Sequence, residues 1–136
     1  MTGVVDFQRF GDELWKIANV FRDDTLKTTE YLEEFSYFLF LKLFDDRERN
    51  QEEIARATGK TYTGYLPEKY RFYTWATAHH PDGLLPFVKR MFIDLATIST
   101  GREYDVLFRK LFSNHTLRIR YEPTIRELTQ RLLTLK

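Results

Sequence analysis

The chain has 136 residues and a formal net charge of +1, with 43% hydrophobic, 16% aromatic and 30% charged residues. This length suits one domain with a single core, and the many aromatic residues argue against a disordered chain. The absence of Cys excludes a disulfide scaffold and thiolate metal sites. With no secretion signal and no apolar run long enough for a bilayer, we expect a cytoplasmic protein without a membrane partner.

The first two predicted elements are helices. Over residues 6–22, apolar residues recur at steps of three and four, and Trp15 widens that stripe, so we expect its ring to lie in the core. The second predicted helix covers residues 30–57, and its first half is apolar nearly all round, which predicts burial on several sides. Its charged second half, which begins at Asp45 and Asp46, is expected to emerge into solvent. The sequence thus predicts an all-α fold, a compact multi-helix bundle around this central helix.

Gly, Pro and polar residues divide the rest of the chain into shorter elements. In chain order we expect a loop at 60–66, a short helix at 67–77, a helix at 83–98, a short helix at 103–112, an extended link at 115–121 and a last helix from Pro123 to about Leu135. The Tyr and Thr side chains of the loop suit exposed positions. Asp82 is placed to cap the helix at 83–98.

The polar residues form no pattern that indicates catalysis. His79 and His80 are adjacent, precede Pro81, and have no third ligand at metal-like spacing. Asp23-Asp24 and Asp45-Asp46 lie at helix ends among other charges, which favours a solvated surface. No phosphate-binding glycine loop and no nucleophile or zinc motif is present. We therefore expect no catalytic residue, no metal and no cofactor in this chain, and a helical interaction domain.

Positive charge is concentrated near the C-terminus. Residues 1–101 hold 13 basic and 16 acidic residues, whereas residues 102–136 hold 8 basic and 4 acidic residues. Arg118 and Arg120 alternate with apolar residues, and Arg126 and Arg131 follow on the last predicted helix. Clustered guanidinium groups of this kind can bind phosphates, so these four are candidates for DNA contact. The alternative is that they serve solubility or pair with carboxylates of the same chain.

Two segments resemble motifs of the methyltransferase (modification) subunit of Type I restriction–modification systems. Residues 13–22, ELWKIANVFR, resemble the opening motif, in which Leu14 and Trp15 precede a helix that ends in an apolar residue and Arg. Residues 31–48 resemble the following motif, in which Tyr31 precedes an apolar helix that ends here in Phe40-Leu41-Lys42-Leu43-Phe44-Asp45-Asp46. Tyr65-Leu66-Pro67-Glu68, followed by Trp75, is similar to the next landmark, and residues 102–136 resemble the end of the domain loosely.

The resemblance implies that residues 1–136 are a single helical N-terminal domain. In such subunits a Rossmann-like domain follows, binds S-adenosylmethionine and methylates adenine at N6. The resemblance also implies partners: a DNA-specificity subunit, a second methyltransferase subunit, restriction subunits that can add to these, and duplex DNA. The N-terminal domain would support subunit assembly, help to enclose the DNA and take part in sensing the methylation state of the target.

The sequence departs from the family where catalysis is concerned. It has no Asn-Pro-Pro-(Phe/Tyr) motif, no strand-linked glycine motif and too few residues for the catalytic domain. The parent protein is therefore expected to be a site-specific DNA (adenine-N6) methyltransferase, whereas this chain carries no catalytic site. Two alternatives stay open: an autonomous helical protein–protein adaptor and, less favoured, a small helical enzyme that uses His79 or His80.

Overall fold

The computed structural model describes residues 12, 15–16, 19 and 28–135, and all regular elements in this part of the chain are helices. The principal helices are α2 (Thr28–Ala57), α3 (Phe72–Thr77), α4 (Leu84–Ala96), α5 (Tyr104–Ser113) and α6 (Glu122–Thr134), and a 3₁₀ turn, η1, spans Glu68–Tyr70. The predicted all-α class is confirmed. Of the predicted helix at 6–22, only residues 12, 15, 16 and 19 belong to the described part, and these are helical.

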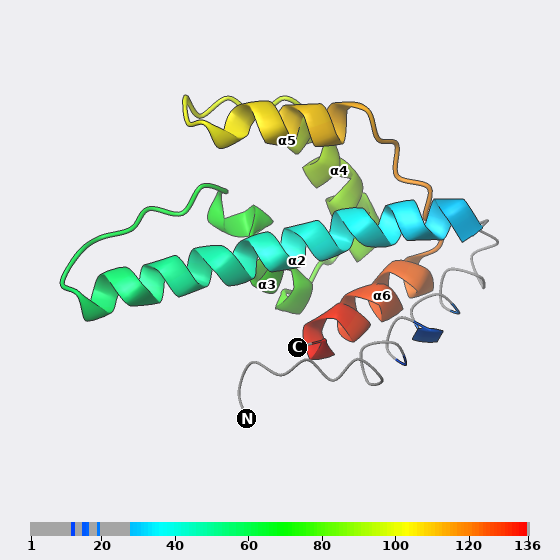
Figure 1. Ribbon diagram of the computed structural model, residues 1–136. Helices are drawn as coiled ribbons and strands as arrows, with labels where there is room; N and C mark the ends of the chain where they lie inside the picture. Colours follow the sequence, from blue (N-terminus) through cyan, green and yellow to red (C-terminus); the bar gives the residue numbers. More distant parts are fainter. Residues whose placement is uncertain (1–11, 13–14, 17–18, 20–27, 136) are drawn as a thin grey trace.

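Helix α2 runs through the middle of the fold, with α4 and α5 on one side and α3 and α6 on the other (Figure 1). Phe38 and Leu41 are fully buried on α2, and Phe44 is nearly so. The ring of Phe38 lies 5.6 Å from that of Phe92 on α4, and the ring of Phe44 lies 5.0 Å from that of Phe108 on α5. The prediction of a central helix is therefore confirmed, and its partners are aromatic.

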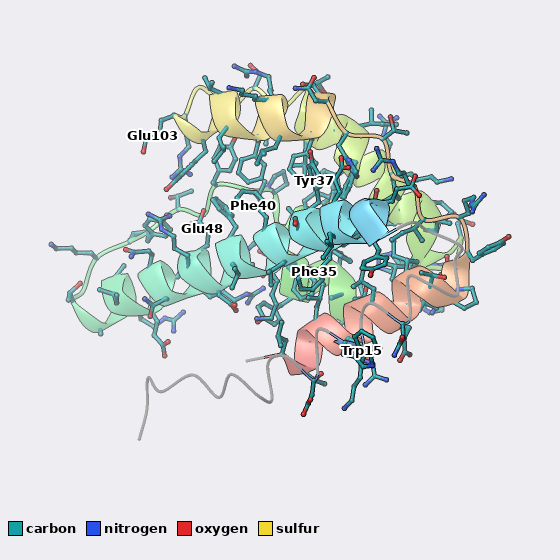
Figure 2. The ribbon with its side chains drawn as sticks, turned by 45° about the vertical axis from the view of Figure 1, so that its right-hand side comes forward. Trp15, Phe35, Tyr37, Phe40, Glu48 and Glu103 are labelled. Carbon is teal, nitrogen blue, oxygen red and sulfur yellow. The ribbon has the colours of Figure 1, made fainter. Side chains whose placement is uncertain are left out.

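The expected burial of α2 on several sides leaves one side of the helix open. Leu32 and Leu43, three turns apart on the same side of the helix, are 56% and 53% exposed. Tyr37 and Phe40 point instead from α2 toward α5 (Figure 2). Helices α3 to α6 cover the other sides of α2, so its Leu32–Leu43 side faces outward.

The predicted helix at 67–77 is two elements, because Arg71 interrupts it. Arg71 has extended backbone angles, φ −71° and ψ 133°, and it separates η1 from α3. Its side chain turns inward to carboxylates of α2. The link at 115–121 forms no strand, as expected, and inserts Ile119 into the core.

Asp82 does not cap α4, contrary to the sequence-based expectation. The residue before the helix is Gly83, with φ 101°, and Glu122 from the first turn of α6 supplies the cap. Its two carboxylate oxygens accept the N–H groups of Leu84 and Leu85 at 2.7 and 2.8 Å. A Cβ atom at position 83 would lie 3.2 Å from Glu122 Oε1, so Gly83 also makes room for this contact. The cap ties the beginnings of α4 and α6 together.

Candidate functional site

The residues that carry the family resemblance differ in how deeply they are buried. Leu41 is fully buried, and Phe40 lies with its ring 5.4 Å from that of Phe108. Tyr31 is half-buried, and Leu14 lies outside the described residues. Trp15 was expected in the core, but it is 63% exposed. The helical period that joins Trp15 to an apolar stripe also places it at the edge of that stripe, where a ring can stay in solvent.

Lys42 and Asp46 form an ion pair one turn apart, with Lys42 Nζ 2.9 Å from Asp46 Oδ2. Tyr73 of α3 donates its hydroxyl to the other carboxylate oxygen of Asp46. Burial would lower the pKa of Lys42, but hydrogen bonds with Asp46 and Tyr73 outweigh it, and the pKa is raised. This buried lysine therefore stays charged and binds α3 to α2.

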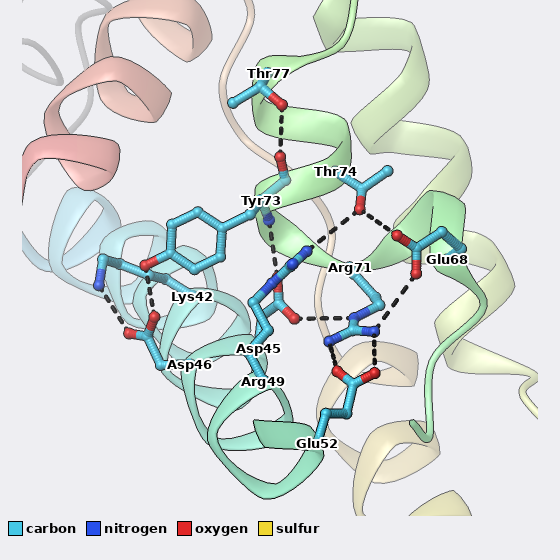
Figure 3. A network of polar contacts seen from close by, with 10 residues as sticks. All are labelled: Lys42, Asp45, Asp46, Arg49, Glu52, Glu68, Arg71, Tyr73, Thr74 and Thr77. Carbon is cyan, nitrogen blue, oxygen red and sulfur yellow. Dashed lines mark hydrogen bonds and ion pairs between the residues drawn. The ribbon is translucent and has the colours of Figure 1, made fainter. Parts of the chain in front are cut away.

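Asp45 lies at the centre of a second polar cluster, shown in Figure 3. Its carboxylate accepts Arg71 Nε at 3.1 Å, Arg49 Nε at 3.0 Å and the backbone N–H of Tyr73 at 2.9 Å. Arg71 also pairs with Glu52 on α2, and this hydrogen bond is the main reason why the pKa of Arg71 is raised. The expectation that Asp45 is solvated was wrong, because its side chain is 1% exposed. Charges in the second half of α2 thus hold η1 and α3 in place.

Two further carboxylates are buried and receive hydrogen bonds from tyrosines. Glu48 accepts the hydroxyl of Tyr62 and, at 2.8 Å, the backbone N–H of Tyr65. Asp105 of α5 accepts the hydroxyl of Tyr65, the hydroxyl of Thr100 and the backbone N–H groups of Thr100 and Gly101. The Tyr65 ring is consequently buried rather than exposed, contrary to the expectation for the loop at 60–66.

His115 joins the link to the first half of α2, and sequence reasoning missed it. The His115 ring stacks on Tyr37 at 3.9 Å and is almost fully buried. Its Nε2 lies 2.9 Å from Glu34 Oε1 and its Nδ1 lies 3.3 Å from Glu33 Oε1, though neither contact has the alignment of a hydrogen bond. No local sequence motif predicts this cluster, because His115 is distant in sequence from Glu33, Glu34 and Tyr37.

The four candidate arginines are not gathered into one free basic patch. Arg118 donates to Glu33 at 2.7 Å and lies 3.9 Å from Glu30, and this hydrogen bond is the largest cause of the lowered pKa of Glu33. Arg126 pairs with Glu122 at 2.6 Å, and Arg131 pairs with Glu127 at 3.0 Å. Arg120 is exposed on the link. The alternative considered from sequence, pairing within the chain, therefore describes Arg118, Arg126 and Arg131.

The two histidines considered from sequence, His79 and His80, differ in their surroundings. His79 is exposed, whereas His80 lies 2.8 Å from the Trp75 carbonyl oxygen through Nε2, with its ring 4.5 Å from that of Phe87. Within the described ranges, no group of three or more His, Asp or Glu side chains is placed to hold a metal ion. None of the helices found there combines the length and apolar composition needed to cross a membrane.

The fold and its polar clusters define an all-helical domain whose ionic groups serve to hold its helices together. A family model described as the HsdM N-terminal domain matches residues 10–132, which is most of the chain. The chain belongs to this family, the N-terminal domains of the methyltransferase subunit of Type I restriction–modification systems. No curated protein and no solved structure gives a significant match.

Proposed function

We propose that this chain is the non-catalytic N-terminal domain of a Type I DNA adenine-N6 methyltransferase subunit, where it supports subunit assembly and encloses DNA. The family match over residues 10–132 carries this proposal. The described polar groups fit such a role, because they cross-link α2 to α3, α5 and the link rather than line a reaction site. The proposal includes a cytoplasmic location, where the DNA substrate lies.

S-adenosylmethionine would bind in another part of the same methyltransferase. Binding of this cofactor and adenine chemistry require a doubly wound parallel sheet and the Asn-Pro-Pro-(Phe/Tyr) motif that the family implies. Residues 28–135 contain helices and connecting segments without a strand, and the motif does not occur in the sequence. We therefore assign neither cofactor binding nor a catalytic step to the described residues.

The proposed partners are a DNA-specificity subunit, a second methyltransferase subunit, restriction subunits and duplex DNA. Arg118, Arg120, Arg126 and Arg131 stay predictions for the DNA contact. Three of them would exchange a carboxylate for a phosphate on binding, which reduces what each contact contributes. Their effect on DNA affinity is therefore expected to be modest.

Removal of this domain from the methyltransferase subunit tests the proposal. The truncated and intact subunits would each be co-expressed with the specificity subunit, and the masses of the purified complexes measured by native mass spectrometry. We expect truncation to abolish the complex of two methyltransferase subunits with one specificity subunit and to abolish adenine methylation. Binding of S-adenosylmethionine, measured by calorimetry, should survive truncation. Intact assembly and methylation after truncation would contradict the proposal and favour the adaptor alternative.

A further inference from the structure

An aromatic pair lies where α2, the loop before η1 and α5 meet. Tyr65 and Tyr104 pack edge to face, with ring centres 5.4 Å apart, and the ring of Phe44 lies 5.4 Å from that of Tyr104. The Tyr65 hydroxyl is bonded to Asp105, which fixes the orientation of this ring. Tyr65 is buried and Tyr104 is half-buried, so the pair is a rigid support just below the surface of the domain.

Two arginines rest on this support from different elements. The guanidinium carbon of Arg47, on α2, lies 5.7 Å from the centre of the Tyr104 ring. That of Arg102, just before α5, lies 5.7 Å from the centre of the Tyr65 ring, and Arg102 Nη1 donates to the carbonyl oxygens of Thr63 and Gly64 at 3.1 Å. Both side chains belong to exposed residues. Cation–π contacts therefore hold the two positive charges over neighbouring rings.

Neither guanidinium is neutralised by a carboxylate within the described part of the chain. Two buried carboxylates bonded to residues of the loop before η1, Glu48 and Asp105, are already satisfied by tyrosine hydroxyls, Thr100 and backbone N–H groups. Glu103 follows Arg102 directly in the chain and is exposed. This arrangement contrasts with Arg126 and Arg131, each of which holds a glutamate one turn away.

We propose that Arg47 and Arg102 form a phosphate-binding pair that contacts the backbone of duplex DNA. This inference rests on the proposed function and assigns its DNA contact to residues that the sequence did not single out. A guanidinium is suited to bidentate phosphate contact, and one that already rests on a ring loses less side-chain freedom on binding. An ion-paired arginine must first give up its carboxylate.

A matched pair of double variants tests the inference. Arg47→Gln/Arg102→Gln and Arg126→Gln/Arg131→Gln each remove two positive charges and keep the first two methylene groups of each side chain. Binding of the protein to a fluorescein-labelled duplex of about 20 base pairs is followed by anisotropy at several salt concentrations. We expect the first variant to lose about tenfold in affinity and to reduce the salt slope by about 1.8, since each phosphate contact contributes about 0.9. The control should lose roughly threefold or less.

A third variant and two readouts separate the possible failures. Glu103→Gln removes the negative charge next to Arg102 and should tighten binding by about twofold at low salt. Circular dichroism confirms that each variant is folded, and co-purification with the specificity subunit reports the proposed function independently. An equal loss in both double variants, unchanged binding by Arg47→Gln/Arg102→Gln, or no duplex binding by the wild type would overturn the phosphate pair. Failure of the wild-type protein to co-purify with the specificity subunit would instead overturn the proposed function.

Discussion

Arg71 donates from Nε to Asp45 Oδ1 at 3.1 Å and so connects the start of α3 to the middle of α2. Both side chains are almost wholly buried, at 10% and 1% exposure. Removing Arg71 leaves the buried carboxylate of Asp45 with only the partly exposed Arg49 and the N–H of Tyr73 as partners. Arg71→Ala should therefore lower the free energy of unfolding by about 2–3 kcal/mol in urea denaturation, less than for a buried charge left with no partner. The double variant Asp45→Ala/Arg71→Ala should cost less than the sum of the single variants, and additive costs would show that the pair is not coupled.

The Glu122 cap on α4 predicts an asymmetry between two glutamates of α6. Glu122→Ala leaves two N–H groups of α4 without their acceptor and should destabilise the domain by about 1–2 kcal/mol. Glu127→Ala is the matched control, because it breaks an ion pair one turn long on the same helix and leaves every cap intact. Its cost should stay below about 0.5 kcal/mol. Equal costs in thermal unfolding would show that Glu122 acts only through its ion pair with Arg126.

Acid should weaken the domain through Asp105. Burial would raise the pKa of this carboxyl, but hydrogen bonds from Thr100, Tyr65 and the N–H groups of Gly101 and Thr100 hold it well below its usual range. A lowered folded-state pKa contributes stability above the unfolded value of about 3.9, and this stability is lost as the pH falls toward the folded value. Asp105→Asn should be less stable than wild type at neutral pH, and the gap should narrow below pH ~4. If the difference in stability between Asp105→Asn and wild type does not change with pH, Asp105 is not the group whose titration weakens the domain.

Alkali should weaken the domain through Tyr70. Burial and the hydrogen bond to Asp94 raise the pKa of Tyr70 to about 12. A raised folded-state pKa contributes stability that is complete below the unfolded value of about 10 and is lost as the pH rises toward 12. The free energy of unfolding, measured by urea denaturation, should fall across this pH interval in both proteins. The fall should be smaller in Tyr70→Phe than in the wild type, by up to about 2 kcal/mol. Equal losses would assign the alkaline sensitivity to other tyrosines, of which Tyr65 also has a raised pKa.

Apolar periodicity predicted most of the helices, since α2, α4, α5 and α6 begin and end within two residues of their expected bounds. The same periodicity does not predict which of the adjacent residues Asp45 and Asp46 is buried in an ion pair. Neighbouring residues on a helix point about 100° apart, so only the tertiary arrangement determines which of them meets Arg71. The Arg71 break and the Glu122 cap likewise depend on contacts 26 and 38 residues apart.

The candidate site was less predictable from sequence than the fold. A signal was present for Arg126 and Arg131, because a glutamate precedes each by four residues and such pairs meet on one helix face. No such signal exists for Arg118, whose partner Glu33 is 85 residues away. Arg47 and Arg102 are also distant in sequence, and their relation emerges only when Tyr65 and Tyr104 meet.

The position of α2 at the centre of the domain is the claim on which the assembly role depends. Hydrogen exchange of the backbone amides, followed by mass spectrometry, tests it directly. Peptides covering Phe38–Asp45 should be the slowest to exchange and should open only on global unfolding, because buried rings and the Arg71 contact cover them. Peptides covering residues 50–57, where the same helix is largely exposed, should exchange faster. Exchange in Phe38–Asp45 as fast as in residues 50–57 would contradict the central placement of α2.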